Sequence, residues 1–306
     1  MNPLRTSILA AADGDAVRRV VATAPVSRDL VRRFVAGETT SDALDATGEL
    51  VDRGLRVALV HLGEPAADRD AAERAVLLHL DLLDQLHDVG LAGDVEVDLT
   101  PSAVGQALDG ALALDNASRV CAAAERAGTS VTLDVEDHTA TAPVLGLLAE
   151  LRRTWPSTGV ALQASLRRTH DDCRALADTR VRLRKGTRAA PASVAFTDPH
   201  EVDLNYVRCA NALLAGAGHP VFATHDPRLV EIVGERSRWY GRAREDFEHQ
   251  MPYGVRPAEQ ARLAAEGHVV RVHVPFGRQW HGHLARRLAE RPAGAASFLR
   301  PLLGRS

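Results

Sequence analysis

Short apolar runs alternate with longer segments of helical periodicity from residue 55 onward, and this alternation restricts the fold more than any other feature. The apolar runs span residues 56–62, 95–99, 131–135, 160–163, 181–184, 221–224, 247–250 and 269–274. Helical patterns lie between them, for example at 70–87, 142–153, 204–215 and 258–266. Eight strand–helix units in about 250 residues predict a (β/α)₈ TIM-type barrel, an α/β fold. An open, doubly wound sheet is the structural alternative.

The first 54 residues have a different texture. Leu30, Val31, Phe34 and Val35 recur at helical spacing, and no strand-like alternation is present. We therefore expect an N-terminal helical segment at 1–54 that packs on a barrel formed by 55–306. In the fifth strand–helix unit, residues 187–197 are expected to form a long loop before the helix.

Composition excludes several classes of protein. The formal net charge is −3, which provides no field for binding nucleic acid. No apolar stretch has the roughly 20 residues needed to span a bilayer, and Asp13 and Asp15 argue against a signal peptide. Three scattered cysteines fit neither a disulfide framework nor a zinc knuckle. We expect a cytoplasmic protein.

Polar residues gather where the expected strands end, and a barrel places its chemistry at the carboxyl ends of its strands. These residues are Asp98, Asp134, Glu136, Gln163, the segment 182–186, the segment 224–226, Gln250 and His273. Because they share one edge of the expected sheet, they indicate an active site without specifying the reaction.

The segment 182–186 combines three cations with a glycine at a strand end. Arg182 and Arg184 point to the same side, and Gly186 lets a ligand approach the backbone closely. Lys185 is the only lysine among 37 basic residues. A phosphate beneath this loop is chemically sensible; a solvated strand end with salt bridges is the alternative.

Two further segments offer anion sites. Asp226 and Pro227 read as an N-cap and a first helical residue, so this helix start could receive an anion or could simply be capped by Asp226. In the last expected helix, 280–291, Arg286 and Arg287 could hold a carboxylate, or they could be surface residues. Arg286 and Glu290 lie one helical turn apart and could pair.

Metal binding has limited support. His281 and His283 are two residues apart on a helix and point in different directions, so they are rejected as a ligand pair. Asp98, Asp134, His225 and His273 all stand at expected strand ends and leave a metal-dependent barrel hydrolase open.

Nine stretches taken in order resemble the monofunctional bacterial proline dehydrogenase family over about residues 33–303. They are Arg33-Phe34-Val35-Ala36-Gly37-Glu38, Leu62-Gly63-Glu64, Leu133-Asp134-Val135-Glu136, Leu162-Gln163, Arg182-Leu183-Arg184-Lys185-Gly186, Phe222-Ala223-Thr224-His225-Asp226-Pro227, Gln250-Met251-Pro252-Tyr253-Gly254-Val255-Arg256, Val274-Pro275-Phe276-Gly277 and Arg286-Arg287-Leu288-Ala289-Glu290-Arg291-Pro292. The resemblance implies a distorted (β/α)₈ barrel that carries FAD. It also implies oxidation of L-proline to Δ1-pyrroline-5-carboxylate by hydride transfer to the flavin, with electrons passing to a quinone or another acceptor. Such an acceptor raises a peripheral contact with the inner face of the membrane as an expectation.

The resemblance also assigns roles to individual residues. Asp134 is the active-site aspartate, and Arg182 lies near the reactive flavin nitrogen; both are catalytic candidates. The implied flavin contacts are Val135, Gln163, Arg182, Arg184, Lys185, Gly186, Thr187, Thr224, His225 and Gln250. The implied substrate contacts are Asp98, His273, Arg286, Arg287 and Glu290. A phosphate contact would explain why Lys185 remains lysine.

Three positions depart from the family pattern. Asp98-Leu99-Thr100 stands where the family has Lys-Leu-Thr, and His273 replaces the tyrosine that packs on the substrate ring. Lys185-Gly186-Thr187-Arg188 replaces Lys-Gly-Ala-Tyr. The changes favour a substituted cyclic imino acid such as hydroxyproline over proline. Alternatively, repulsion between Asp98 and Asp134 raises one carboxyl pKa, and the barrel binds flavin or another ligand without turning over proline.

Overall fold

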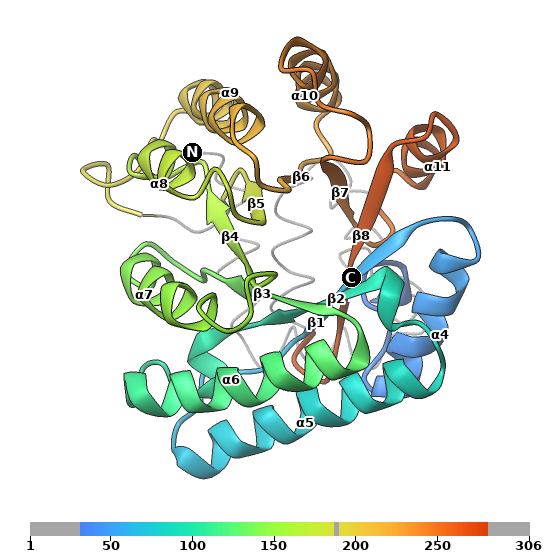
Figure 1. Cartoon of the computed structure of the whole chain (residues 1–306), viewed down its shortest axis with the longest axis vertical. Helices are drawn as coiled ribbons and strands as arrows, with labels where there is room; N and C mark the ends of the chain where they lie inside the picture. Colours follow the sequence, from blue (N-terminus) through green and yellow to red (C-terminus); the bar gives the residue numbers. More distant parts are fainter. Residues whose placement is uncertain (1–30, 187–189, 281–306) are drawn as a thin grey trace, which may run out of the picture.

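The computed structural model describes residues 31–186 and 190–280, and its centre is a closed barrel of eight parallel strands. Each strand pairs with the next in sequence, and the eighth pairs with the first (Figure 1). The strands are β1 (Arg56–His61), β2 (Val95–Leu99), β3 (Ser130–Asp134), β4 (Gly159–Gln163), β5 (Val181–Arg184), β6 (Val221–Ala223), β7 (Glu248–Pro252) and β8 (Val269–Phe276). The (β/α)₈ prediction is confirmed, and the open-sheet alternative is wrong because β8 closes onto β1.

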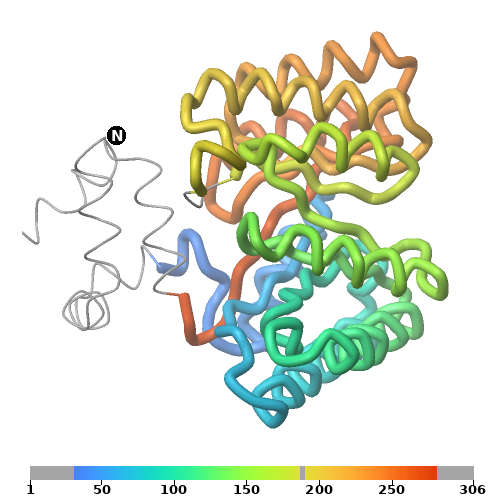
Figure 2. The backbone as a smooth tube through the Cα atoms, turned by 90° about the vertical axis from the view of Figure 1, so that its left-hand side faces the viewer, coloured from blue at the N-terminus to red at the C-terminus, as the bar shows by residue number. Residues whose placement is uncertain are grey.

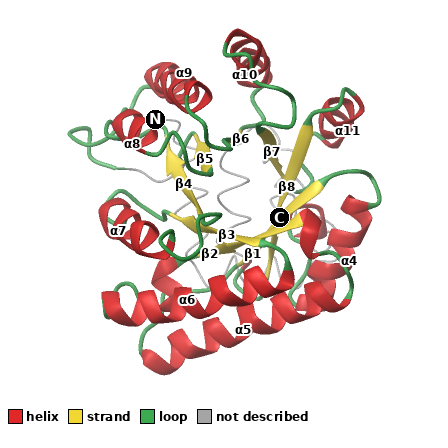
Figure 3. Ribbon diagram, viewed as in Figure 1, coloured by secondary structure: helices red, strands yellow, loops and turns green. Residues whose placement is uncertain are grey.

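Helices surround the strands on the outside (Figure 3). They are α4 (Thr40–Val51), α5 (Arg69–Asp88), α6 (Gly110–Ala127), α7 (Thr141–Leu151), α8 (Thr169–Ala175), α9 (Pro199–Ala215), α10 (Pro227–Trp239) and α11 (Pro257–Ala265), with short 3₁₀ turns η1 (Ala92–Asp94) and η2 (Pro101–Val104). The helix starts follow their sequence signals. Asp226 accepts a hydrogen bond from the Arg228 amide at 3.0 Å and caps α10, whose first residue is Pro227.

The segment before β1 packs against the end of the barrel sheet. α4 contacts β1 and β8, and the Ala36 amide donates to the Pro275 carbonyl at 2.9 Å. Figure 2 shows this proximity of the first described residues, in blue, to β8, in red. Residues 1–30 lie outside the described residues, so the division into a helical segment at 1–54 and a barrel at 55–306 stays a prediction.

The two faces of each strand differ in chemistry. One face is apolar and joins helix residues such as Val76, Leu82 and Val120 in the main core; it includes Val57, Leu59, Val97, Leu99, Leu133, Val160, Leu183, Phe222, Val272 and Val274. The alternate positions are polar or small. They face the lumen, because Arg182 on β5 reaches Asp98 on β2 across the barrel. The apolar core is therefore a shell around the strands, and the lumen is largely polar.

The seventh and eighth strands extend two residues beyond their expected ends. The seventh strand runs Glu248–Pro252, so Phe247 precedes it and packs against Phe222 with ring centroids 6.0 Å apart. In the fifth unit, a long connection does precede α9, as expected, and its residue Ala195 forms an isolated antiparallel bridge with Leu166 of the connection between β4 and α8.

Candidate active site at the carboxyl end of the barrel

Arg182 lies inside the lumen and joins two carboxylates of β2. Its Nη2 donates to Asp98 Oδ1 at 2.6 Å, its Nη1 pairs with the other Asp98 oxygen, and it also binds Glu96. The side chains of Arg182 and Asp98 are almost fully buried. The strand-end reading of Arg182 as a solvated salt bridge is wrong because the guanidinium is enclosed by carboxylates inside the barrel.

Asp98 and His273, the two residues that differ from the family pattern near the expected substrate, contact each other. His273 Nε2 lies 3.2 Å from Asp98 Oδ2, although the residues stand on β8 and β2. Burial opposes ionisation of Asp98, but the Arg182 charge and the hydrogen bond from His273 hold its pKa well below the ordinary value. The expected rise from repulsion with Asp134 is therefore not found at Asp98.

The rim above this pair brings together three predicted flavin contacts. Arg184 Nη2 lies 2.7 Å from Asp134 Oδ1 and also donates to the Val135 carbonyl. Gln163 Nε2 donates to the same carbonyl at 3.0 Å. The Val135 backbone thus ties β3 to β4 and β5, and it fixes the directions of the two side chains.

Lys185 and Gly186 form the predicted phosphate loop. Lys185 Nζ lies 2.6 Å from Asp203 Oδ1 and 3.1 Å from Asp226 Oδ2. Partial burial opposes ionisation of Asp226, but hydrogen bonds from Arg228 and Lys185 lower its pKa to about 2. A phosphate at Lys185 would compete with two carboxylates. Gly186 has φ +98°, and a Cβ there would collide with Ser165 Oγ.

The loop after β6 is anchored from both sides. The Thr224 hydroxyl accepts from the Asp226 amide at 3.2 Å, and the Thr224 amide donates to the Gln250 carbonyl at 3.1 Å. Arg256 Nη1 donates to the His225 carbonyl at 3.0 Å. Asp226 caps α10 with Oδ1, and its Oδ2 is taken up by Lys185 and the Arg228 side chain, so the structure supports the capping alternative at this helix start.

Four predicted site residues lie outside the described residues: Thr187, Arg286, Arg287 and Glu290. Of the others, Asp134, Gln163 and Arg184 end their strands, whereas Arg182, Gln250 and His273 stand further back, within β5, β7 and β8. His281 and His283 also lie outside this range. Among the described residues, no group of three or more potential ligands could hold a metal ion. Asp98, Asp134, His225 and His273 therefore form no ligand set, and the metal-dependent hydrolase is not supported.

Sequence reasoning missed a second charged layer deeper in the lumen. Glu96, Arg180, Glu248 and Arg271 each stand two residues before a chosen strand-end residue. Arg180 donates to Glu96 at 2.8 Å, and Arg271 binds Glu248 through Nε at 2.5 Å and Nη2 at 3.0 Å. The available signal was the period-two pattern, which places residues i and i−2 on the same face of a strand.

In the described part of the chain, none of the helices is long and apolar enough to cross a membrane.

Comparison with known proteins identifies relatives of this chain. Residues 182–300 match the family model described as proline dehydrogenase. A proline dehydrogenase of Deinococcus radiodurans is 36% identical over 286 residues, which cover 90% of each chain. Proline dehydrogenase 1 of Bacillus subtilis is 31% identical over 274 residues, covering 89% of this chain and 90% of that protein.

The fold similarity extends to larger proteins. The structure of proline utilization A (PutA) from Bdellovibrio bacteriovorus superposes with a TM-score of 0.80 at 22% identity. It covers 91% of this chain, which spans only 34% of that protein. The PutA of Bradyrhizobium japonicum gives a TM-score of 0.72 at 23% identity. The sequence relatives, matched over nine-tenths of their length, show that this chain is a (β/α)₈ barrel that belongs to the proline dehydrogenase family.

Proposed function

We propose that this protein is an FAD-dependent oxidoreductase that acts on the CH–NH group of L-proline or a substituted cyclic imino acid. A hydride would pass from the ring carbon of the CH–NH group to the flavin, the ring nitrogen would release a proton, and the product would be the corresponding pyrroline-5-carboxylate. Support comes from the family relationship and from one observation at the carboxyl end of the barrel. There, Gln250 Nε2 and Arg184 Nε are buried donors that lack a hydrogen-bond partner among the described residues.

These unsatisfied donors fit a flavin. A buried donor without a partner costs about 1–3 kcal/mol, and the carbonyl and ring-nitrogen acceptors of an isoalloxazine would remove that cost. Gln163 and Val135 line the same rim. Thr224 and His225 directly precede Asp226, whose amide donates to the Thr224 hydroxyl and whose carboxylate accepts from Lys185. We therefore assign the flavin ring to the Gln163–Arg184–Gln250 side and its phosphates to the Lys185–Gly186 loop.

The bound flavin would accept the hydride. The chain's own residues orient both partners: Arg184 fixes Asp134 at the rim, and Asp98 fixes Arg182 and His273 beneath it. We propose that Arg286 and Arg287 hold the substrate carboxylate as a planar fork, with Glu290 near the ring amine. A quinone or another acceptor would take up the electrons and so complete the cycle. We propose a cytoplasmic enzyme that meets its acceptor in solution or at the inner membrane face.

The contact between Asp98 and His273 favours a substituted substrate. Both Asp98 oxygens are engaged by Arg182 and His273, so Asp98 does not offer an open acceptor to the substrate. His273 is the partly exposed member of the pair and presents a polar ring where the family has tyrosine. A hydroxyl on the imino acid ring would hydrogen bond with this imidazole, whereas unsubstituted proline would leave it unmatched.

Anaerobic mixing tests the proposal. The protein is reconstituted with FAD, freed of excess flavin, and mixed without oxygen with L-proline, hydroxyproline or L-alanine. We expect bleaching of the flavin absorbance by the cyclic imino acids and not by alanine. A protein that binds FAD but stays yellow with every cyclic imino acid would instead be a ligand-binding barrel without turnover.

The substrate preference is tested separately with His273→Tyr. We expect kcat/KM for hydroxyproline to exceed that for proline in the native protein, and the ratio to move toward proline in the variant. Arg287→Ala should depress both substrates alike, because it removes a contact to their shared carboxylate. A native preference for proline of tenfold or more, about 1.4 kcal/mol in the barrier, would contradict the substituted-substrate proposal.

A further inference from the structure

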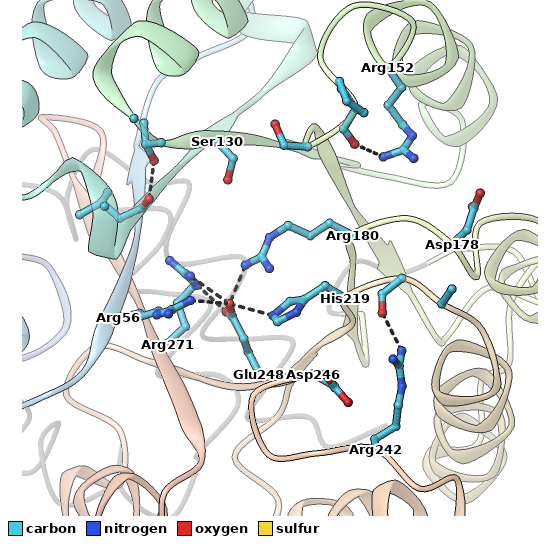
Figure 4. A pocket seen from close by; sticks show the side chains of 18 residues that line it. Arg56, Ser130, Arg152, Asp178, Arg180, His219, Arg242, Asp246, Glu248 and Arg271 are labelled. Carbon is cyan, nitrogen blue, oxygen red and sulfur yellow. Dashed lines mark hydrogen bonds and ion pairs between the residues drawn. The ribbon is translucent and has the colours of Figure 1, made fainter.

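The amino end of the barrel carries a hollow of about 590 Å³ whose lining is dominated by arginine. It is separate from the site described above, since strand ends at opposite edges line the two. Five guanidiniums face it, from Arg56, Arg152, Arg180, Arg242 and Arg271, with His219 beside them (Figure 4). Three carboxylates, Asp178, Asp246 and Glu248, also line it. The lining side chains therefore carry an excess of two positive charges, one of which, on Arg180, is also paired with Glu96 outside the lining.

Glu248 cannot neutralise the remaining arginines because it is already fully engaged. Its carboxylate, which is completely buried, binds Arg271 at 2.5 and 3.0 Å, Arg180 at 3.1 Å and His219 at 3.2 Å. Arg56 reaches it only at 3.8 Å, and the Arg56 side chain is 44% exposed. Figure 4 shows these cations converging on the one carboxylate.

Two arginines of the wall have no carboxylate partner in residues 31–186 and 190–280. Arg242 Nη2 donates to the Gly218 carbonyl at 2.6 Å, and Arg152 Nη1 donates to the Thr158 carbonyl at 3.3 Å. A carbonyl fixes the guanidinium without neutralising it. Arg242 Nε is in addition a buried donor with no hydrogen-bond partner among those residues. Both guanidiniums are thus held in place at the hollow, and each keeps an unneutralised positive charge and N–H donors that could bind an anion.

Asp178 and Asp246 do not pair with the arginines of the wall. Asp246 accepts a hydrogen bond from the Ala243 amide at 2.9 Å, and Asp178 accepts one from the Thr179 hydroxyl at 3.2 Å. Neither forms an ion pair with an arginine within the described residues. Figure 4 shows both carboxylates apart from the central cluster around Glu248.

We infer that the arginine-lined hollow at the amino end is a binding site for a small multivalent phosphate anion. Guanidinium forks match the paired oxygens of a phosphate. Ser130, Ser157 and Thr129 add hydroxyls to the lining, and Gly93 and Gly128, which have open space beside them, leave room for close approach. The amino face of such barrels ordinarily serves stability, so this site would lie apart from the oxidation chemistry and does not depend on the cofactor assignment.

Isothermal titration of the FAD-loaded protein with inorganic pyrophosphate, at constant ionic strength, tests the inference. We expect saturable binding of one pyrophosphate per chain, and we expect Arg152→Gln/Arg242→Gln to weaken it at least tenfold. Arg69→Gln is the matched control. Arg69 is the first residue of α5, and its exposed guanidinium pairs with Asp109 away from the hollow. Lys185→Gln identifies any binding at the opposite phosphate loop.

A variant that gains affinity guards against misfolding as an explanation. Asp178→Asn removes a negative charge from the lining and keeps an acceptor for Thr179, so pyrophosphate should bind about threefold more tightly. Circular dichroism checks that the arginine variants are folded, and Arg56→Gln replaces them if they are not. The inference is overturned if pyrophosphate does not saturate, if the arginine substitutions leave its affinity unchanged, or if only Lys185→Gln abolishes binding.

Discussion

Two layers of side chains inside the same barrel differ in how completely they satisfy one another. In the amino-end layer, Glu96 and Glu248 pair with Arg180 and Arg271, Glu96 also binds Arg182 of the carboxyl-end layer, and both carboxylates are matched. In the carboxyl-end layer, two residues further along the strands, Arg184 Nε and Gln250 Nε2 are buried without partners among the described residues.

This difference separates stability from function within one lumen. Matched buried charges hold the barrel together from inside, because removing one member leaves its partners uncompensated in a medium that solvates charge poorly. Unmatched buried donors raise the free energy of the folded chain until an acceptor pairs with them. In the function proposed above, the flavin supplies these acceptors to the carboxyl-end layer.

The largest effect is expected from Glu248→Gln. The substitution leaves Arg180 and Arg271 buried without their common counter-ion, which should lower the free energy of unfolding by about 3–5 kcal/mol. Urea denaturation measures it. Glu235→Gln, which breaks an exposed pair with Arg238, should cost under about 1 kcal/mol. A loss at Glu248 no greater than that of the control would remove the distinction between the layers.

Acid should weaken the amino-end layer next. Burial opposes ionisation of Glu248, but Arg180, His219 and Arg271 hold its pKa well below its ordinary 4.5. A carboxyl whose pKa is lowered on folding stabilises the native state above its unfolded pKa, and this stabilisation is lost as the pH falls. The free energy of unfolding should drop below about pH 4.5, by up to about 1.4 kcal/mol per pH unit for each proton taken up. Glu248→Gln should show a shallower drop, and an equal slope in both proteins would contradict the assignment.

Gly186→Ala should impair the carboxyl end specifically. Its φ of +98° and the collision of a Cβ with Ser165 force the loop to move, so FAD affinity should fall at least tenfold, about 1.4 kcal/mol. Gly90→Ala is the matched control, because Gly90 has φ +73° but open space around it. It should cost about 1 kcal/mol of stability and leave FAD affinity unchanged. Equal FAD affinity in both variants would show that the loop does not contact the cofactor.

The sequence alone predicted the barrel because its signals are local. Apolar runs and helix starts such as Asp226-Pro227 depend on residues near one another in the chain, and they placed all eight strands within two residues of their observed bounds. The ion pairs inside the barrel could not be predicted from these local signals. Asp98, Arg182 and His273 stand on three strands, and only closure of the barrel brings them together.

The second charged layer, deeper in the lumen, could have been predicted from the sequence. Glu96, Arg180, Glu248 and Arg271 share the period-two register of the chosen strand ends, and charged side chains at buried strand positions require partners. What the pattern does not contain is the pairing itself. Both Glu96 and Asp98 bind Arg182, and this arrangement follows from the stagger of strands around a closed barrel.

β7 carries both layers on one strand, and comparing Glu248→Gln with Gln250→Leu tests the separation most directly. For each variant, urea denaturation of the cofactor-free protein gives the free energy of unfolding, and fluorescence titration gives the FAD dissociation constant. We expect Glu248→Gln to lose stability while the folded fraction binds FAD with native affinity. We expect Gln250→Leu to keep its stability, since it removes an unpaired buried amide, and to bind FAD at least tenfold more weakly. If both substitutions shift the same quantity, or if Gln250→Leu binds FAD as tightly as the native protein, the two layers do not have separate roles.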